Sequence, residues 1–404
     1  MKPILLFDLD NTLLQNDINS FLGGYLKALS KQLATVIPPE KMINELLSAT
    51  DKMTTKTMPD QTLEETFDRF FYPGIGIPKP ELAGTLQLFY EEVFPTLKYL
   101  TSPSYKAIQL VNTAFEQGYQ IVVATNPLFP RRAILHRLQW ANLPIEQYPF
   151  SLVTSYENLH FAKPNPAYYA EILAQLGWPD QSAVMIGDSL EDDIIPASQL
   201  GIPGFFVTYR PVSLPIDLHP FCRQGLIEQI MPWIHEVDNA DIKLNATTPS
   251  ACLAILKSTP AGLETLKNRI TDRSWNNRPN PDEWCLVEIM AHLRDVDKEV
   301  HRPRCEKVCQ EENPFLPGID TDLWAEERSY IQENGPRVFT QFQAGRTELL
   351  NLLANLPAEY WQRPARHAIF GPTCLNELVS FIATHDQAHV HQSFEVIQAG
   401  FQVK

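Results

Sequence analysis

The chain begins with a short apolar run, Ile4–Phe7, which ends abruptly in two carboxylates, Asp8 and Asp10. Side chains alternate along a strand, so the two acids share one face only while the strand continues. At the carboxyl end of the strand both can reach a ligand in a crevice. Two acids at the mouth of a buried strand are typical of a Mg²⁺-assisted nucleophilic site, although acidic residues also cap ordinary turns.

Further apolar runs alternate with helical patterns as far as about residue 233. These runs are Ile121–Ala124, Ser151–Thr154, Ala183–Ile186 and Gly204–Thr208. Their spacing predicts βαβ units, with a parallel sheet covered by helices on both faces. Residues 15 to about 100 are too many for one crossover. Their helical periodicity predicts an inserted helical cap over the strand tips, with helices near Asn19–Gln32, Glu40–Asp51 and Glu64–Phe71.

Strand signals vanish beyond Glu236, and the polar segment His235–Pro249 is typical of a linker. The remainder predicts four long amphipathic helices separated by loops rich in Pro and Gly, which indicates a four-helix bundle. These helices are Pro249–Thr271, Trp284–Glu312, Pro336–Asn355 and Thr373–Ala399. We therefore expect an α/β domain over residues 1–235 and an all-α domain over residues 247–404.

Composition excludes several classes of partner. The formal net charge of −15 opposes binding to nucleic acid or to an anionic membrane surface. No apolar segment approaches the ~20 residues that a membrane span needs, and the N-terminus does not resemble a signal peptide. The six cysteines form no Cys-x-x-Cys pair, so a disulfide framework is not expected and a cytoplasmic location is.

Several more polar residues follow predicted strands, where phosphoryl-transfer chemistry needs them. Thr125 and Asn126 end one strand, and a hydroxyl with backbone N–H groups there can hold phosphate oxygens. Lys163 can neutralise both a nucleophile and a phosphoryl group. Asp188, with Asp192 or Asp193, follows another strand and can complete an oxygen shell for Mg²⁺. Each residue alone is also compatible with an ordinary turn or loop; their order along the chain favours the functional interpretation.

With these motifs, residues 1–235 resemble the haloacid dehalogenase (HAD) superfamily, which has a Rossmann-like core. The four motifs of that family match Asp8-Leu-Asp10-Asn11-Thr12, Thr125, Lys163, and Gly187-Asp188 with a later acid. The resemblance implies that Asp8 is a nucleophile that forms an aspartyl-phosphate, and that Asp10 protonates the leaving group and then activates water. It also implies that Thr125 and Lys163 bind phosphate.

The same resemblance implies a Mg²⁺ ion held by Asp8, the carbonyl of Asp10 and Asp188. Asp192 and Asp193 both remain candidates for the last acid, and Asp193 is preferred because Asp193-Ile-x-x-Ala is most similar to the family pattern. Members of the dehalogenase branch lack the second acid, so Asp10 favours a phosphatase. A helical cap at this position implies a small phosphorylated metabolite as substrate, whose identity the sequence does not give.

A second constellation lies in the predicted bundle. His385 and His389 are four residues apart, so both imidazoles lie on one helical face and can bind one metal ion. His292 lies among apolar residues on another helix and points inward. Three imidazoles from facing helices are typical of metal sites in bundles, with Asp386 or Asp295 orienting a ring. The simpler alternative is three histidines packed in a core. His301, His367 and His391 are expected at the surface.

Residues 247–400 resemble the DinB-like superfamily of four-helix bundles. The resemblance rests on Trp284-Cys-x-x-Glu288-Ile-x-x-His292-Leu, on Phe370-Gly-Pro-Thr and on His385-Asp-x-x-His389-x-x-Gln392. It implies a divalent transition metal (zinc, nickel or iron) on His292, His385 and His389.

Three interpretations follow. The leading one is a phosphatase fused to a metal-binding bundle. A second places the main activity in the bundle, as a metal-dependent thiol transferase or hydrolase. A third makes the bundle non-catalytic, serving homodimerisation or regulation.

Overall fold

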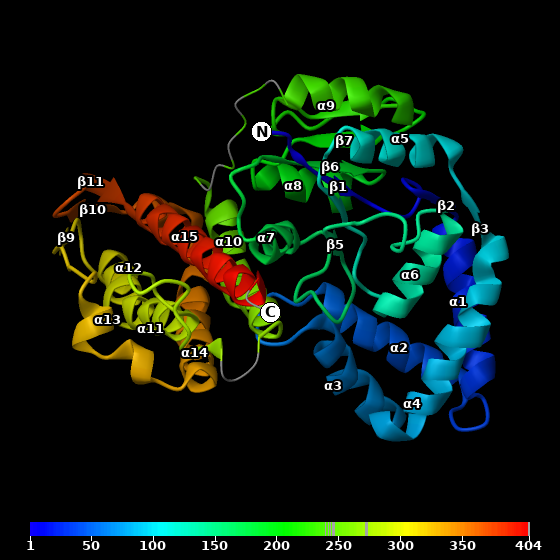
Figure 1. Cartoon of the computed structure of the whole chain (residues 1–404), viewed down its shortest axis with the longest axis horizontal. Coiled ribbons are helices and arrows are strands. Elements are labelled where there is room, and N and C mark those ends of the chain that lie inside the picture. The colour runs from blue at the N-terminus through cyan, green and yellow to red at the C-terminus, as the bar shows by residue number, and fades with distance from the viewer. Residues whose placement is uncertain (239, 241, 243, 245–246, 271–273, 403–404) are drawn as a thin grey trace. The chain divides into compact units, whose positions relative to one another are not determined.

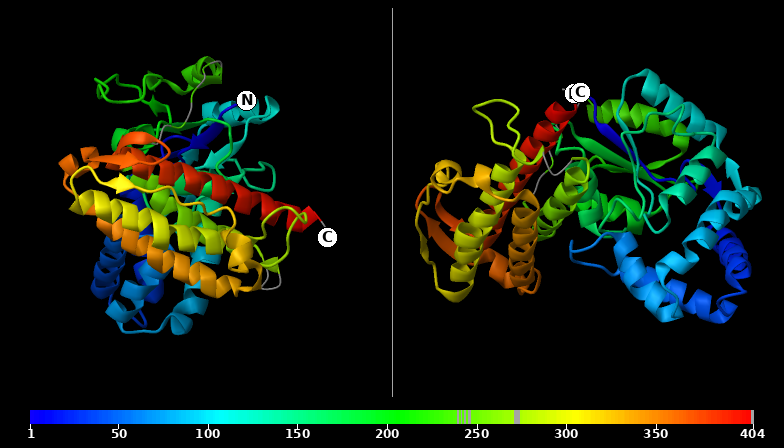
Figure 2. Two further views of the ribbon diagram at one scale, coloured as in Figure 1. Left: turned by 90° about the vertical axis from the view of Figure 1, so that its left-hand side faces the viewer. Right: turned by 60° about the horizontal axis from the view of Figure 1, so that its bottom comes forward.

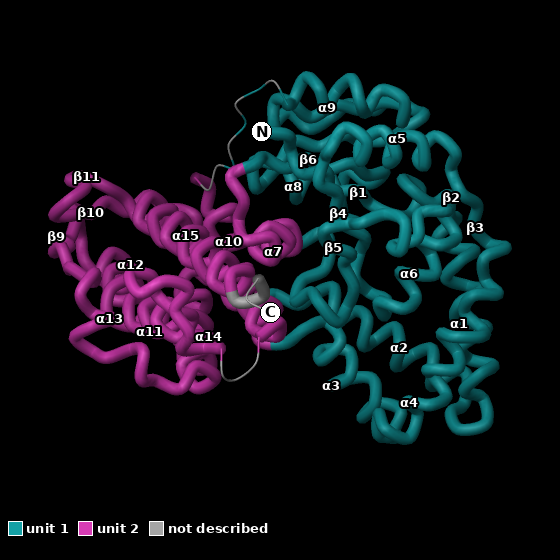
Figure 3. The backbone as a smooth tube through the Cα atoms, viewed as in Figure 1, with its two compact units in different colours: residues 1–57, 61–165, 181–244 teal, residues 58–60, 166–180, 245–404 magenta. Residues whose placement is uncertain are grey.

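The structure, a computed structural model, describes all residues except 239, 241, 243, 245–246, 271–273 and 403–404, and for residues 400–402 it describes the backbone alone. Two compact units are distinguished (Figure 3): residues 1–57, 61–165 and 181–244 form the first, and residues 58–60, 166–180 and 245–404 form the second. Residues 239, 241, 243, 245 and 246 of the predicted linker, and the predicted helix end at Thr271, lie outside the described residues. The domain boundaries at residues 235 and 247 stay predictions.

The first unit is built on a sheet of six strands in which every neighbouring pair runs parallel, in the order β5-β4-β1-β6-β7-β8. The strands are β1 (Ile4–Phe7), β4 (Ile121–Val123), β5 (Leu152–Val153), β6 (Ala183–Gly187), β7 (Gly204–Val207) and β8 (Arg223–Gly225). Phe7 pairs with Val123 on one side and with Ile186 on the other. The residues that follow these three strands therefore meet at one edge of the sheet.

The strand β1 is apolar at every position because it is buried on both faces, as strands of parallel sheets are. Figure 1 shows α9 (Ile230–Asp238) and α8 (Ile195–Gln199) on opposite sides of the sheet. The helices α5 (Tyr105–Glu116) and α6 (Arg131–Trp140) belong to the same unit. The parallel sheet with surrounding helices confirms the predicted fold class of this part of the chain.

Helices fill the interval between β2 (Leu14–Asn16) and β3 (Thr101–Pro103), two strands that pair antiparallel where this insertion leaves and rejoins the core. The helices are α1 (Ile18–Leu33), α2 (Pro39–Thr54), α3 (Leu63–Ile75) and α4 (Lys79–Leu88), followed by a π-helical turn over Phe89–Val93 and a 3₁₀ helix over Phe94–Leu100. Local chemistry sets their starts. Asp17 caps α1 by accepting from the Ser20 amide at 2.7 Å, and Thr62 and Glu65 form a capping box on α3.

Four long helical segments make up most of the second unit and lie side by side in Figure 2. They are α10 (Pro249–Lys267), α11 and α12 (Leu286–Val296 and Arg302–Gln310, joined by a π-helical turn over Asp297–His301), α14 (Gly335–Ala354) and α15 (Leu375–Gln402). The helix α7 (Pro166–Gln175) packs on α10. Gly262 permits their close approach, since a Cβ there would come within 2.6 Å of the Ala174 side chain. The predicted helical bundle is confirmed.

Within the described residues the second unit also holds a small sheet, β11-β10-β9, so the prediction of no strands beyond Glu236 is wrong. The strands are β9 (Phe315–Leu316), β10 (Pro364–His367) and β11 (Gly371–Cys374), and short helical turns occur at α13 (Trp324–Glu327), Tyr330–Gln332 and Ala358–Gln362. These strands have only two to four residues, and β10 and β11 contain Pro or Gly, so none of the three forms the longer apolar run that signals a strand. In the described part of the chain, every helix is too short or too polar to cross a membrane.

Candidate functional sites

At the carboxyl edge of the sheet, Lys163 lies between two carboxylates. Its Nζ is 2.7 Å from Asp8 Oδ1 and 2.6 Å from Asp193 Oδ1. All three side chains are nearly excluded from solvent. The Asp8 amide still donates to the Ile186 carbonyl at 2.9 Å, so the last hydrogen bond of the ladder fixes the carboxylate at the strand end.

The turn after β1 positions Asp10. Asn11 adopts the left-handed conformation (φ 55°), and its amide donates to the Leu14 carbonyl at 2.7 Å, which closes a tight turn. Asn16 Nδ2 then donates to Asp10 Oδ1 at 2.8 Å. The buried guanidinium of Arg137, from α6, forms an ion pair with the same carboxylate.

Arg137 is a site residue that the sequence analysis missed. A signal for it exists in the sequence: Ala133 and Ile134, one helical turn earlier, and Leu138, next in sequence, are all apolar and buried. A charge among the apolar positions of a helix needs a buried partner, and such a charge points to a functional or structural ion pair.

The segment after β6 brings in the remaining acids. Ser189 caps the following π-helical turn by accepting from the Asp192 amide at 3.1 Å, and the Ser189 amide donates to Asp193 Oδ2, also at 3.1 Å. A Cβ at Gly187 would overlap the Asp193 carboxylate, so only glycine leaves room for that acid. Asp193 is buried and contacts Lys163, whereas Asp192 is partly exposed. The geometry therefore favours Asp193 over Asp192.

The structure places the two predicted phosphate-binding residues, Thr125 and Asn126, differently. Asn126 lines the same cavity as the acids, and its buried Oδ1 has no hydrogen-bond partner in the part of the chain that the structure describes. Thr125 is buried, and its main-chain carbonyl accepts from the Thr154 hydroxyl at 2.8 Å. Thr125 is not among the described residues that line the cavity, so the structure brings Asn126 to the acids more directly than Thr125.

Three of the acids suit a divalent cation. Asp8, Asp188 and Asp193 each place a carboxylate oxygen within 4.8 Å of the others. Burial, and then the neighbouring acids, raise the pKa of Asp8 well above its usual range despite Lys163, and burial and Asp193 raise the pKa of Asp188 to about 6. A nearby cation would offset the cost of ionising Asp8 and Asp188, and carboxylate oxygens are the ligands that Mg²⁺ prefers.

A cavity of about 470 Å³ opens over these groups. Most of the predicted site residues line its inner end, namely Asp8, Asp10, Asn126, Lys163, Asp188 and Asp193. Asn11, Ser189 and Arg137 lie there too, while helices of the insertion supply the outer walls. The chain thus encloses the acids beneath a wall that the helical insertion supplies.

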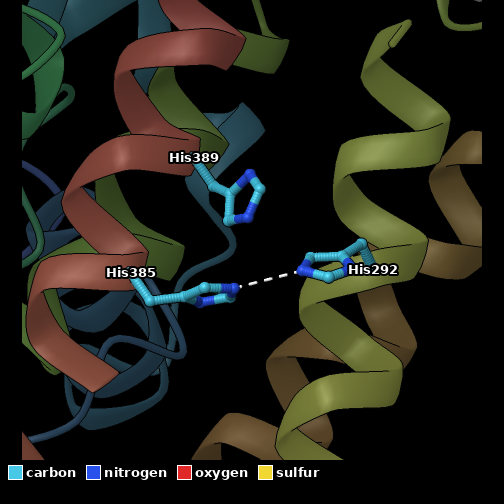
Figure 4. Close-up of side chains that lie close together, drawn as sticks. All are labelled: His292, His385 and His389. Carbon is cyan, nitrogen blue, oxygen red and sulfur yellow. Dashed lines mark hydrogen bonds between the residues drawn. The ribbon is translucent and has the colours of Figure 1, made fainter. Parts of the chain in front are cut away.

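In the second unit, three histidines converge from two helices. Figure 4 shows His385 and His389 on α15 facing His292 on α11. The Nε2 atoms of His292 and His385 are 3.1 Å apart, and the three ligand nitrogens lie within 4.8 Å of one another. The sequence-predicted trio is therefore brought together.

Two rings border this trio. The Trp284 indole lies parallel to the His389 ring, at 6.0 Å and 6°, and also contacts His292. The His301 ring stands edge-on to that of His385 at 5.2 Å, and its Nδ1 lies 3.1 Å from Asp297. The prediction that His301 and His367 are surface residues is wrong: His301 is largely buried beside the trio, and His367 is 4% exposed. The side chain of His391 is 44% exposed.

The expected orienting acids lie elsewhere. Asp386 is fully buried but accepts from Arg346 at 2.9 Å and from Thr259 at 2.7 Å, and Asp295 accepts from Tyr330 and Arg328. The Nδ1 atoms of His292 and His385 have no hydrogen-bond partner among the described residues. The prediction that Asp386 or Asp295 orients a ring is therefore wrong, because arginine partners hold both carboxylates in ion pairs.

Burial keeps the trio in the neutral form that binds metal. Burial, with His389 and His301 nearby, lowers the pKa of His292 to about 3, and burial lowers the pKa of His385 and of His389 as well. Neutral imidazoles whose nitrogens converge on one position are suitable ligands for a divalent transition metal. Three such ligands leave a coordination position open. The donor set therefore fits such an ion.

Comparisons with known proteins agree with both halves. The family model of haloacid dehalogenase-like hydrolases matches residues 5–207, and that of the DinB superfamily matches residues 255–393. The glyceraldehyde 3-phosphate phosphatase of Methanothermobacter thermautotrophicus is 26% identical over 217 residues, which cover 51% of this chain and 86% of that protein. YuaE of Bacillus subtilis is 22% identical over 138 residues, covering 31% of this chain and 85% of that protein.

Among solved structures, YfiT from Bacillus subtilis, a four-helix bundle of unusual topology, is 17% identical, with a TM-score of 0.35. The match covers 40% of this chain and 91% of that one. The α/β fold with its edge cluster of acids defines a hydrolase. The chain belongs to the haloacid dehalogenase-like hydrolase family, its relatives include a phosphatase, and residues 255–393 are similar to the DinB superfamily.

Proposed function

We propose that this protein is a Mg²⁺-dependent phosphatase that hydrolyses a small phosphomonoester through an aspartyl-phosphate on Asp8. The observation that carries the proposal is the bridge of Lys163 between Asp8 and Asp193, with Asp188 completing a cluster of oxygen ligands within 4.8 Å. A carboxylate that attacks a phosphodianion meets like-charge repulsion. A buried lysine in contact with that carboxylate lowers the repulsion.

The residues have distinct roles in two half-reactions. A carboxylate oxygen of Asp8 forms a bond to phosphorus while the bond from phosphorus to the ester oxygen breaks, and Asp10 gives its proton to the departing alcohol. Water then attacks the aspartyl-phosphate, Asp10 takes back a proton, and inorganic phosphate leaves. Arg137 and Asn16 fix the position of Asp10 for both steps. Lys163 offsets charge at the nucleophile, and Thr125 and Asn126 orient the phosphoryl group.

Asp8, Asp188 and Asp193 would hold the Mg²⁺ ion, together with the main-chain carbonyl of Asp10 that the family motif implies. When bound, the ion supplies positive charge next to the transferring phosphoryl group. Burial supports this assignment, because the raised pKa values of Asp8 and Asp188 return toward their usual range beside a cation.

We also propose that His292, His385 and His389 bind zinc, nickel or iron. What supports this is the pair of facing Nε2 atoms, with two Nδ1 atoms left without partners. An open coordination position favours a second candidate function, a metal-dependent thiol transfer or hydrolysis in the bundle. A non-catalytic bundle that serves dimerisation or regulation is the third candidate. We also propose a cytoplasmic location, as predicted from a sequence without a Cys-x-x-Cys pair.

Phosphate release from a panel of phosphorylated metabolites, with and without Mg²⁺, tests the leading proposal. We expect Mg²⁺-dependent turnover in the wild type and none in Asp8→Asn, and a phosphoryl adduct on Asp8 in the mass spectrum of acid-quenched Asp10→Asn. Turnover that survives in Asp8→Asn refutes the mechanism. Removing the bound metal, and replacing one of its ligands in His385→Ala, distinguishes the roles of the bundle. Loss of an activity of the bundle indicates the second candidate, and a change in assembly alone indicates the third.

A further inference from the structure

The walls of the cavity change character with distance from the acids. Its inner end is formed by charged and polar groups of the sheet edge. Helices of the insertion, labelled α1 to α4 in Figure 1, supply side chains to its outer walls. Most of these side chains are apolar or aromatic. Side chains that define the outer walls are Leu22, Tyr25, Leu29, Leu46, Phe67 and Phe71. A phosphoryl group at the acids would therefore place the rest of its ester among hydrocarbon.

The outer walls offer few polar partners. No charged side chain of residues 17–100, all of which the structure describes, is among those that line the cavity. The hydroxyls of Tyr25 and Tyr90 lie 3.0 Å apart and bond to each other. Arg137 is engaged with Asp10 and packed between the rings of Phe21 and Phe129, at 5.3 and 5.5 Å. The hydroxyls of Thr50, Tyr72 and Tyr156 also line the cavity, and that of Thr50 already donates to the Leu46 carbonyl at 2.8 Å. A sugar or nucleotide would therefore regain only part of the hydrogen bonds that its own polar groups lose with their water.

The volume sets the size of the occupant. About 470 Å³ falls within the range of pockets that enclose a whole small organic molecule. Aromatic walls favour an aromatic occupant, since rings attract one another edge-to-face beyond their burial of apolar area.

We propose that the substrate is a phosphomonoester with an uncharged, apolar organic part, most favourably one that carries an aromatic ring. This inference rests on the proposed phosphatase activity and adds the substrate class. The outer cavity selects the ester by burying its hydrocarbon, while the sheet edge reacts with any phosphoryl group that reaches it.

The test compares three phosphate esters of primary alcohols, so that the leaving groups are alike. We expect kcat/KM with Mg²⁺ to be at least about 100-fold higher for 3-phenylpropyl phosphate than for glycerol 3-phosphate, with hexyl phosphate between them. Equal values, or a preference for glycerol 3-phosphate, overturn the inference and leave the phosphatase intact. No phosphate release from these esters or from p-nitrophenyl phosphate overturns the proposed function and this inference with it.

Substitutions at two matched leucines distinguish an effect on the cavity wall from a general effect on the helical insertion. Leu22 lines the cavity and is 37% exposed, whereas Leu88, on another helix of the insertion, is 48% exposed and is not among the lining residues. We expect Leu22→Gln to lower kcat/KM about tenfold for 3-phenylpropyl phosphate and to leave glycerol 3-phosphate unchanged. Leu88→Gln should change neither. An equal loss for both esters in Leu22→Gln would contradict the assigned role of the wall.

Discussion

The guanidinium of Arg137 forms an ion pair with the carboxylate of Asp10, although the two residues are 127 positions apart. Arg137 is 1% exposed, and a buried guanidinium needs such a partner to offset its desolvation. Arg137 and Asn16 both donate to Oδ1 of Asp10, which leaves Oδ2, in a fixed position, to give and accept the proton. The pair ties α6 to the turn after β1, and it makes Arg137 a positioning residue in the proposed reaction.

Arg137→Met should lower kcat of the phosphatase by about 10- to 100-fold with little change in KM, because Asp10 loses its anchor while the phosphate-binding groups remain. The decisive measurement is a double-mutant cycle with Asp10→Asn. If Arg137 acts through Asp10, the added substitution has almost no further effect in that background. Independent, multiplicative losses would show that Arg137 contributes in another way. Thermal unfolding of each variant controls for lost packing.

Lys163→Met should abolish activity and destabilise the metal-free protein by about 3 kcal/mol, because removal of one partner leaves buried carboxylates without a counter-charge. Lys79→Met provides a matched control. Lys79 also bridges two acids, Glu64 at 2.7 Å and Asp68 at 2.6 Å, but its side chain is 45% exposed. For Lys79→Met, urea unfolding should show a loss of less than about 1 kcal/mol in the free energy of unfolding. Similar losses of stability in the two variants would show that burial of the Lys163 ion pairs does not determine their contribution.

Gly187→Ala should weaken Mg²⁺ binding strongly, since the added Cβ occupies the space of the Asp193 carboxylate. Gly84→Ala is the control: Gly84 lies within α4, and a Cβ added there would have no neighbouring atom within 4 Å, so the variant should be neutral or stabilised by up to about 1 kcal/mol. Isothermal titration calorimetry with Mg²⁺ measures the affinity of each variant for the ion. Unchanged affinity in Gly187→Ala would remove Asp193 from the metal site.

Acid should destabilise the metal-free bundle. Histidine titrates near pH 6.5 when unfolded, whereas burial lowers the pKa of His292 to about 3 in the folded chain. Because the folded pKa is depressed, this stability is fully present above pH 6.5 and is lost as pH falls toward 3, by at most about 1.4 kcal/mol per pH unit for each such histidine.

Hydrogen exchange in α11 and α15, followed by mass spectrometry at about pH 7.5 and about pH 5.5, measures this effect in the bundle alone. His385→Gln removes one titrating group, so its stability should fall less steeply with acid than that of the wild type. A slope as steep as the wild type's would show that His385 does not contribute. Added Zn²⁺ should oppose the acid effect, because it binds the neutral rings.

The sequence predicted what depends on local pattern. Strand tips could be located from apolar runs, and the four-residue spacing of His385 and His389 placed both rings on one face. His301 could not be placed in this way. It lies nine residues after His292, which at about 100° per residue puts it on roughly the opposite face of an unbroken helix. The π-helical turn over Asp297–His301 adds a residue to one turn and rotates His301 toward the trio.

Long-range pairing also escaped prediction. Arg137 and Asp10 meet only because α6 and β1 belong to one α/β layer structure, and no spacing rule links them. Asp386 follows the metal-binding candidate His385 in sequence, yet its carboxylate forms an ion pair with the buried Arg346 of α14. Periodicity describes which face of an element a side chain occupies, whereas the partner on that face is decided by how distant elements pack.

The packing of α7 on α10 has a consequence for dissecting the protein. The helix α7 lies in sequence between Lys163 and β6, inside the hydrolase half, while its packing groups it with the bundle. No single cut in the chain can therefore release two intact halves: a fragment ending near residue 244 would carry α7 without α10, and the complementary fragment would expose the α10 surface around Gly262. The two units are interleaved in sequence rather than arranged in tandem, so truncation is a poor way to separate the functions of the two parts.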